Sequence, residues 1–379
     1  MDKEKYRDIA PYGPYDVAQA IVRLRNSPQF MIGLGELLSS DDAEARTAID
    51  AFKARLPVIL ENVKTYEDFQ RNVTAGMMIP TILKNSVGSF TFSGADLLDK
   101  DTPYLFISNH RDIVLDCTLL DYALLQSGMR LCEMAIGDNL LVNQFATDMF
   151  KLNGGITVKR DLPMREKYLE SIRLSEYFIE SITEAHQSIW VAQKSGRSKD
   201  GIDNTNSAII KMLYLSKKRT GVSFAELIKA CNIVPVAISY EYDPCDINKG
   251  REEISKLLHG GEYRKKKYED LLNMLRGLRK YKGDIHLSFG TPLVDDFASP
   301  EEVAREVDRQ IHLGYRLWDT NCFAYDYLEG TDRFASRYAG LDTKKFLDRY
   351  KGLKPDVRNF VLNSYANPVR SYLTETNAN

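Results

Sequence analysis

The segment PYLFISNHRDIVLD, residues 103–116, places a histidine and two aspartates directly after a short apolar run. The run at 104–107 is typical of a buried strand, and His110 follows it, with Asp112 and Asp116 two and six positions further on. An imidazole beside a carboxylate can act as a general base, because the carboxylate fixes its tautomer and stabilises the imidazolium that forms. We therefore predict an enzyme that activates a hydroxyl or an amine, with either aspartate as the partner of His110. A histidine that only caps or packs is the alternative.

Positively charged residues follow two later strand-like runs. LNGGITVKR (152–160) ends in two cations, and IWVAQKSGRSKDG (189–201) breaks from an apolar run into a glycine-containing loop. A further segment, NIVPVAISYEY (232–242), is typical of a strand with a proline near its start, which suits a strand edge or an entry point. The candidate binding residues in these segments are Lys159, Arg160, Lys194, Gly196, Arg197, Ser198 and Pro235.

The positions of these segments after strands predict that their side chains meet. In a parallel sheet the carboxyl ends of the strands lie at one edge and collect the ligands, so we expect His110, Arg160 and Arg197 to face one crevice. Arginine forks match phosphate oxygens in a bidentate manner. A base beside several cations therefore predicts a substrate with a hydroxyl to activate and a phosphate to anchor.

The elements that must position these residues alternate along the chain. Strand-like runs at 89–92, 104–107, 156–158, 189–192, 233–240 and 285–289 are separated by helical segments such as 115–125, 165–184 and 263–278. This alternation predicts an α/β fold with a mostly parallel or mixed central sheet flanked by helices. Residues before 95 have helical patterns, with Asp41 and Asp42 placed to cap a helix through Phe52 and a second helix over 66–78, and the aromatic-rich tail is also helical. We predict an N-terminal helical region (1–95), an α/β domain (96–296) and a C-terminal helical extension (297–379).

Composition narrows the class of protein. The chain has 379 residues, 44% hydrophobic and 27% charged, with a net charge of −2, so no global charge favours binding to nucleic acid. Its five cysteines, at 117, 132, 231, 245 and 322, show no C-x-x-C spacing and predict neither a disulfide framework nor a metal site. No stretch approaches the roughly 18 to 20 apolar residues that span a bilayer, and the first residues lack the apolar segment of a secretory signal. We expect a cytoplasmic protein whose membrane contact, if it has any, is peripheral at the inner face.

One segment departs from this charge balance. Residues 249–282 contain eleven Lys and Arg against five Asp and Glu. The simplest interpretation is a solvated helical face. The functional alternative is a surface for an acidic acyl carrier protein, for coenzyme A phosphates or for anionic lipid headgroups.

The tetrad HRDI is also similar to the start of a protein-kinase catalytic loop. The asparagine that such a loop needs five residues after its aspartate is replaced here by Cys117. The chain has no glycine-rich phosphate loop upstream and no D-F-G downstream, and a kinase needs both. We therefore exclude a protein kinase.

In their order and in their residues, these segments resemble the conserved blocks of the glycerol-phosphate acyltransferase superfamily, whose first block is His-x4-Asp. The resemblance is greatest to the bacterial glycerol-3-phosphate acyltransferases. The segment MLRGLRKYKGDIHLSFGTPL (274–293) is similar to that group's final block, so the resemblance covers roughly residues 102–295. It implies an acyltransferase of phospholipid synthesis that moves a fatty acyl group from acyl-CoA or acyl carrier protein to the hydroxyl of glycerol 3-phosphate or a lysophospholipid. It implies no cofactor and no metal.

The resemblance also implies roles for single residues. His110 would be the catalytic base and Asp116 its charge-relay partner, while Arg160 would contact the acceptor phosphate. The run 196–198 would match the Gly-x-Arg-Ser part of the third block, another acceptor-binding element, and Pro235 would shape the acyl-donor side.

Two departures from the family pattern leave alternatives open. The first block is one residue longer here, so Asp112 competes with Asp116 for the partner role. The third block lacks the family's glutamate, because residues 193–195 are Gln, Lys and Ser. The alternatives are an acyltransferase for another lipid acceptor (lysophosphatidic acid or an amino-acid-derived lipid) and a non-catalytic relative that binds lipid or a carrier.

Overall fold

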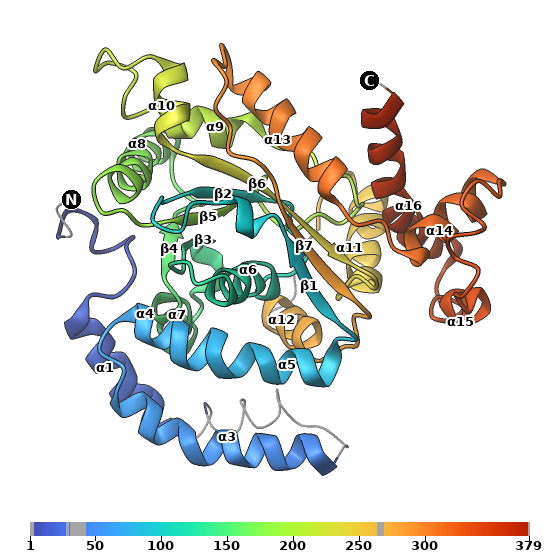
Figure 1. The fold of residues 1–379 in the computed structure, drawn as a ribbon, viewed down its shortest axis with the longest axis horizontal. Coiled ribbons are helices and arrows are strands. Elements are labelled where there is room, and N and C mark those ends of the chain that lie inside the picture. Colours follow the sequence, from blue (N-terminus) through green and yellow to red (C-terminus); the bar gives the residue numbers. More distant parts are fainter. Residues whose placement is uncertain (1–3, 28–29, 31–42, 264–268, 378–379) are drawn as a thin grey trace.

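The computed structural model describes residues 4–27, 30, 43–263 and 269–377 and is built around one seven-stranded sheet (Figure 1). The strands are β1 (Phe90–Ser93), β2 (Leu105–Ser108), β3 (Glu133–Gly137), β4 (Gly155–Val158), β5 (Ile189–Ala192), β6 (Ile233–Tyr240) and β7 (Ile285–Phe289). Their order in the sheet is β1-β7-β6-β2-β5-β3-β4. Strands β6, β2, β5, β3 and β4 are mutually parallel, whereas β7 is antiparallel to β6 and parallel to β1. The predicted α/β class with a mostly parallel or mixed sheet is confirmed.

Helices connect and flank these strands. They are α1 (Pro14–Arg25), α3 (Ala43–Glu61), α4 (Tyr66–Phe69), the π-helix η2 (Gln70–Met78), α5 (Ile79–Ser86), α6 (Leu115–Gln126), α7 (Gln144–Leu152), α8 (Met164–Thr183), α9 (Ser207–Tyr214), α10 (Phe224–Ala230), α11 (Asp246–Leu258), α12 (Glu269–Arg279), α13 (Pro300–Gly314), α14 (Asp319–Glu329), α15 (Thr343–Asp348) and α16 (Pro355–Asn377). Single 3₁₀ turns lie at Glu4–Tyr6, Ala95–Leu97 and Asp138–Leu140.

Helices cover both faces of the sheet. Since successive side chains of a strand point to opposite faces, each strand contributes to two separate cores. In β2, Phe106 belongs to a core that includes residues of α1, α3, α5 and α6. Leu105 and Ile107 belong to a second core, formed with α8, α9, α10 and α13. Figure 1 shows α5 and α6 on one side of the sheet and α9 and α13 on the other. A third, aromatic cluster around Phe346 and Tyr350 joins α14, α15 and α16.

Most of the predicted elements are present, with informative exceptions. The predicted helix over 66–78 is helical throughout, but its second part has π geometry. The proposed caps Asp41 and Asp42 lie outside the described residues, and the helix they would begin, α3, extends to Glu61. Strand β3 was not predicted, because its apolar run of three residues, 134–136, is too short to show a period.

The interpretation of Pro235 as an edge residue is wrong, because β6 lies inside the sheet between β2 and β7. Its carbonyl accepts a hydrogen bond from Gly290, one residue beyond the end of β7. The N–H and C=O of one strand residue point to the same side, so Pro235 offers the β7 side an acceptor and no donor. The ladder between β6 and β7 therefore ends at this proline.

Two further predictions concern organisation. The division into 1–95, 96–296 and 297–379 stays a prediction; β1 begins at Phe90 and the last strand ends at Phe289. Among the residues described, no helix combines the length and the apolar character that crossing a membrane requires.

Candidate active site

His110 lies between β2 and α6, and its ring contacts a carboxylate in the first turn of α6. Its Nδ1 is 2.8 Å from Oδ2 of Asp116, which is fully buried. A carboxylate only accepts hydrogen bonds, so Nδ1 carries the proton of this pair, and in the neutral ring Nε2 is then the nitrogen with the lone pair. The His110 side chain also lines a pocket. This is the arrangement that a general base requires, with one nitrogen held and the other available.

Of the two aspartates that the sequence left open, only Asp116 contacts the His110 ring. Asp112 Oδ1 instead accepts hydrogen bonds from the N–H groups of Val114 and Leu115, each at 2.9 Å, and so closes the turn that precedes α6. Burial, aided by the neighbouring Asp116 charge, raises the pKa of the Asp112 carboxyl above its ordinary value. Asp112 therefore shapes the turn.

The extra residue of the His-x5-Asp spacing is taken up before the helix begins. Residues 109–112 are not helical and a turn follows at 113–114, so α6 starts only at Leu115. Asp116 Oδ2 also accepts the N–H groups of Arg111, at 2.5 Å, and of Asp112, at 2.9 Å. The backbone between the base and its partner thus wraps around the carboxylate and brings it back to His110.

The pocket beside His110 has a volume of about 610 Å³ and lies where the parallel strands end. Residues at or just after the ends of β2, β3, β4 and β5 line one part of it, and residues from α11, α12 and the segment between them line another. The lining includes His110, Ile113, Ile136, Gly137, Asn139, Leu140, Arg160, Trp190, Ala192, Lys194, Gly196, Arg197, Lys199, Glu252, Lys256, Tyr263 and Asp270. Four of the predicted binding residues, Arg160, Lys194, Gly196 and Arg197, therefore share the pocket with His110.

Arg160 reaches the pocket across a glycine at the end of β3. A methyl group added at Gly137 would lie 2.5 Å from Arg160 Nε and 2.6 Å from its Cζ, and 2.5 Å from Oδ1 of Asn139. The guanidinium therefore packs directly on the Gly137 backbone. Arg160 is exposed, and its backbone N–H donates to Asp138 Oδ2 at 3.4 Å. Within the described ranges its guanidinium forms no ion pair with a carboxylate.

We expect Gly137→Ala to weaken acceptor binding without unfolding the protein, because the added methyl displaces the flexible end of an exposed side chain. On the prediction that Arg160 binds the acceptor phosphate, the KM for such an acceptor should rise about tenfold while kcat changes by less than about twofold, as for loss of one charged hydrogen bond. Initial-rate kinetics measure both. Gly352→Ala is the control, because a methyl there meets nothing within 4 Å. An unchanged KM in Gly137→Ala would separate Arg160 from acceptor binding.

The loop after β5 supplies the other cations. Gly196 has a φ of +79°, a conformation that favours glycine. The next residue, Arg197, lines the pocket and has a buried Nη1 without a hydrogen-bond partner in the part of the chain that the structure describes. Lys194 donates to the carbonyl of Ile202 at 2.8 Å. Lys199, by contrast, is neutralised by the carboxylates of Glu252 and Glu253 at 2.6 and 2.9 Å.

Three predicted binding residues lie outside the pocket lining. Ser198 is buried, and its N–H donates to the His110 carbonyl at 2.6 Å, which ties the cationic loop to the base. Lys159 pairs with Asp8 at 2.7 Å and with Glu170 at 3.3 Å. Pro235 is buried in β6. Ser198 therefore acts on the site through the backbone, whereas Lys159 is occupied by acidic residues.

Sequence reasoning missed a buried ion pair that supports the same loop. Arg111, next to His110, directs its guanidinium to Asp203 at 2.5 Å, and both side chains are buried. Asp203 also accepts a hydrogen bond from Asn109 at 3.1 Å. Since Asp203 lies at the far end of the cationic loop, this network holds both the residues that flank the base and the loop that carries Arg197.

Trp190, in β5, is another residue that the sequence did not identify. Its ring lies edge-on to the His110 imidazole, with the centroids 5.6 Å apart and the planes at 71°. Its Nε1 donates to Ser108 Oγ at 2.8 Å, which fixes the indole. The apolar body of Trp190 thus forms a wall of the pocket beside the base.

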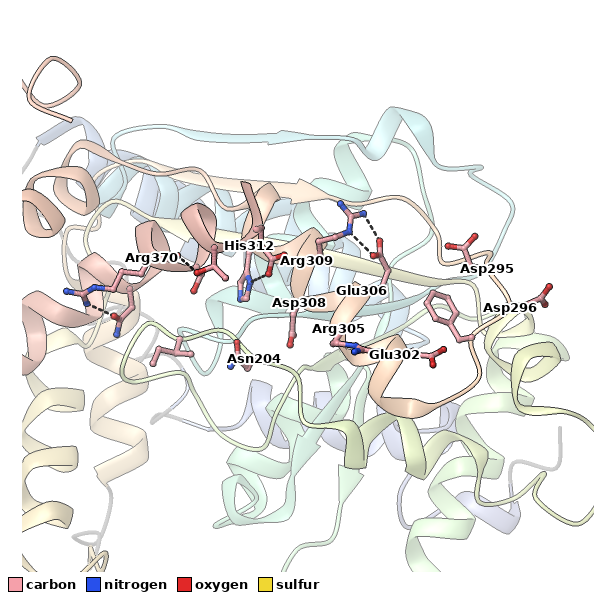
Figure 2. A pocket seen from close by; sticks show the side chains of 16 residues that line it. Asn204, Asp295, Asp296, Glu302, Arg305, Glu306, Asp308, Arg309, His312 and Arg370 are labelled. Atoms are coloured by element: carbon pink, nitrogen blue, oxygen red, sulfur yellow. Dashed lines mark hydrogen bonds and ion pairs between the residues drawn. The ribbon is translucent and has the colours of Figure 1, made fainter. Parts of the chain in front are cut away.

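A larger cavity, of about 880 Å³, lies elsewhere, between α13, α16 and residues 202–204 (Figure 2). None of its lining residues in the described part of the chain was predicted as a site residue. Several of its charged side chains already pair with one another: Figure 2 shows Arg309 with Glu306, and His312 contacts Glu375 at 3.0 Å. Both ring nitrogens of His312 are engaged, Nδ1 by Glu375 and Nε2 by the Asp203 carbonyl, each at 3.0 Å, whereas the contact of His110 with Asp116 uses Nδ1.

The basic segment 249–282 is not simply a charged surface. Residues 264–268 lie outside the described residues. Lys249 is buried and pairs with Asp243 at 2.6 Å, and Lys282 is buried against Ser86 Oγ at 2.8 Å. Burial lowers the pKa of Lys282 to about 8. The prediction of a solvated face or docking surface is therefore wrong for these two lysines, which are part of the interior.

Comparison with known proteins agrees with the motifs. Residues 89–239 match a family model described as Acyltransferase. Among solved structures, the 1-acyl-sn-glycerophosphate (LPA) acyltransferase PlsC from Thermotoga maritima is 15% identical, over 79% of this chain and 92% of that chain, with a TM-score of 0.36. No curated protein is similar enough in sequence to match. The matched residues include His110, Asp116 and Arg197, and this match supports the predicted resemblance to the glycerol-phosphate acyltransferase superfamily.

Proposed function

We propose that this protein transfers a fatty acyl group from a thioester donor to a hydroxyl of a phosphate-bearing acceptor, either glycerol 3-phosphate or a lysophospholipid. The observation that carries the proposal is the position of His110. Its Nδ1 is held by Asp116, and its ring opens into the pocket that Arg160 and Arg197 also line. A base and unpaired cations in one pocket suit an acceptor that has a hydroxyl and a phosphate.

The reaction that follows is a direct transfer. His110 Nε2 removes the proton of the acceptor hydroxyl while the oxygen attacks the thioester carbonyl. Asp116 stabilises the imidazolium through its contact with Nδ1. The C–S bond then breaks, and the departing thiolate takes the proton from His110 and leaves as a thiol. One ester forms for each thioester that is consumed, and the reaction needs no acyl-enzyme intermediate.

The acceptor phosphate is assigned to Arg160 and Arg197, with Lys194 beside them. Neither guanidinium forms an ion pair with a carboxylate in the part of the chain that the structure describes, although the charge of Arg197 acts on buried Asp112. A phosphate would supply a directly bound negative charge. Holding the phosphate fixes the hydroxyl next to His110 and makes the step effectively unimolecular. The apolar wall of Ile136 and Trp190 offers surface for the acyl part of a substrate.

A thiol-release assay tests this function. We expect thiol release from palmitoyl-CoA when glycerol 3-phosphate or a lysophospholipid is present, and little when glycerol replaces them, because only the first two carry a phosphate. The acceptor panel also includes lysophosphatidic acid and an amino-acid-derived lipid, and an acyl carrier protein thioester is tested as the donor. Comparing the rates identifies the acceptor and the donor. Transfer to glycerol at the same rate would remove the arginines from acceptor recognition. A fully folded protein that releases no thiol with any acceptor would favour a non-catalytic binding protein.

We also propose a cytoplasmic protein that contacts anionic membranes peripherally at the inner face. Leu257 and Leu258, at the end of α11, are 73% and 71% exposed, directly after Lys256 at the pocket. Binding to vesicles that contain phosphatidylglycerol should weaken as salt rises, because the Debye length shortens, and should fall in Leu257→Ser/Leu258→Ser. Sedimentation measures it, with exposed Val22→Ser on α1 as the control. Equal binding to neutral vesicles, or no loss in the double variant, would contradict this surface.

A further inference from the structure

The buried carboxylate of Asp116 has a second side-chain partner, which comes from another strand. Tyr240, the last residue of β6, donates its hydroxyl to Asp116 Oδ1 at 2.7 Å, while His110 Nδ1 contacts Oδ2. Tyr240 is 2% exposed and Asp116 is fully buried. Oδ2 contacts the base and also accepts two backbone N–H groups, whereas Oδ1 accepts the Tyr240 hydroxyl.

The phenol of Tyr240 remains a hydrogen-bond donor across the working pH range. The pKa of Tyr240 is raised well above its ordinary value. Burial is the largest cause, and the negative charge of Asp116 is the second. A protonated hydroxyl next to a carboxylate must donate to it. The other titratable groups that act electrostatically on this cluster are Asp112, Cys117 and Asp243.

We propose that Tyr240 is a positioning residue for acyl transfer, which holds the Asp116 carboxylate in register with His110 and limits how strongly that carboxylate stabilises the imidazolium. The inference rests on the proposed function, because it assigns Tyr240 a part in the same proton transfer. A donor on Oδ1 withdraws negative charge that would otherwise act on the imidazolium. Removing it should make His110 hold its proton to higher pH and leave the carboxylate held only at Oδ2, by His110 and two backbone N–H groups.

The test is Tyr240→Phe, which keeps the ring and removes only the hydroxyl. We expect kcat at pH 7 to fall about tenfold, with the acceptor KM changed less than about twofold, as for loss of one hydrogen bond to a charged group. The acid limb of the kcat/KM profile should move to higher pH. Tyr350→Phe is the matched control, because Tyr350 is also fully buried and donates to a buried carboxylate, that of Asp246, at 2.8 Å. Tyr350→Phe should lower the free energy of unfolding by a similar amount and leave the pH profile of kcat/KM unchanged.

A second readout does not depend on turnover. The chain has five histidines, so the titration of His110 can be followed by NMR and assigned by its loss in His110→Gln. It should shift to higher pH in Tyr240→Phe and not in Tyr350→Phe. An unchanged His110 titration in folded Tyr240→Phe would overturn the role of Tyr240, whatever the assay shows. A shifted titration in a protein without any transferase activity would support the coupling and reject the proposed function, so the two failures are distinguishable.

Discussion

His110→Ala should lower the rate of acyl transfer by about a thousandfold or more while leaving the protein folded. General-base catalysis contributes roughly 10²–10⁴ to a rate, and His110 is the imidazole that lines the pocket of Arg160 and Arg197. The variant keeps the His110 backbone carbonyl, which accepts the Ser198 N–H, so the cationic loop stays anchored. Thiol release measures turnover, and thermal unfolding followed by circular dichroism measures stability.

The control for this variant is His259→Ala. His259 lies at the end of α11, and its Nδ1 contacts the Ser255 carbonyl at 2.7 Å. It does not line the pocket, so its removal should leave kcat within about twofold of the original value. Acceptor binding, measured by calorimetry, should survive in His110→Ala because the arginines remain. Near-normal turnover in His110→Ala would exclude this imidazole as the base.

The second large effect concerns stability. Arg111→Met should lower the free energy of unfolding by about 3–5 kcal/mol, because it leaves the buried Asp203 carboxylate without its cation. The contact is 2.5 Å long, and both side chains are at most 5% exposed. Burial opposes the charge on Arg111, but the nearby Asp203 carboxylate outweighs it and raises the pKa of the guanidinium above its ordinary value. Chemical denaturation measures the loss.

Two further variants make this prediction specific. Arg25→Met breaks an ion pair of similar length, 2.8 Å, whose partners are 43% and 54% exposed, and should cost about 1 kcal/mol or less. Adding Asp203→Asn to Arg111→Met should recover part of the stability, because the uncompensated charge is removed. Equal losses in Arg111→Met and Arg25→Met would contradict a structural role for the buried pair.

Much of the site was predictable because it follows from local order in the chain. The runs at 104–107 and 189–192 show their strand character directly, and β2 and β5 are indeed parallel neighbours. Parallel strands bring the residues that follow them to one edge of the sheet. His110, Arg160 and Arg197 were therefore expected in one crevice, and all three line one pocket. Strand β3 escaped prediction because its few apolar residues match no unique period.

The remaining features depend on contacts between distant residues and on side-chain direction. Lys159 and Arg160 are adjacent in sequence, yet the first pairs with Asp8, 151 positions away, and the second enters the pocket. Asp116, not Asp112, meets His110, because the turn at 113–114 brings it back. Tyr240 reaches Asp116 from 124 positions away. The sequence by itself determined which chemical groups stand at the strand ends. The packing of separate strands and helices decided which of these groups touch, because spacing along a chain does not specify distance in space.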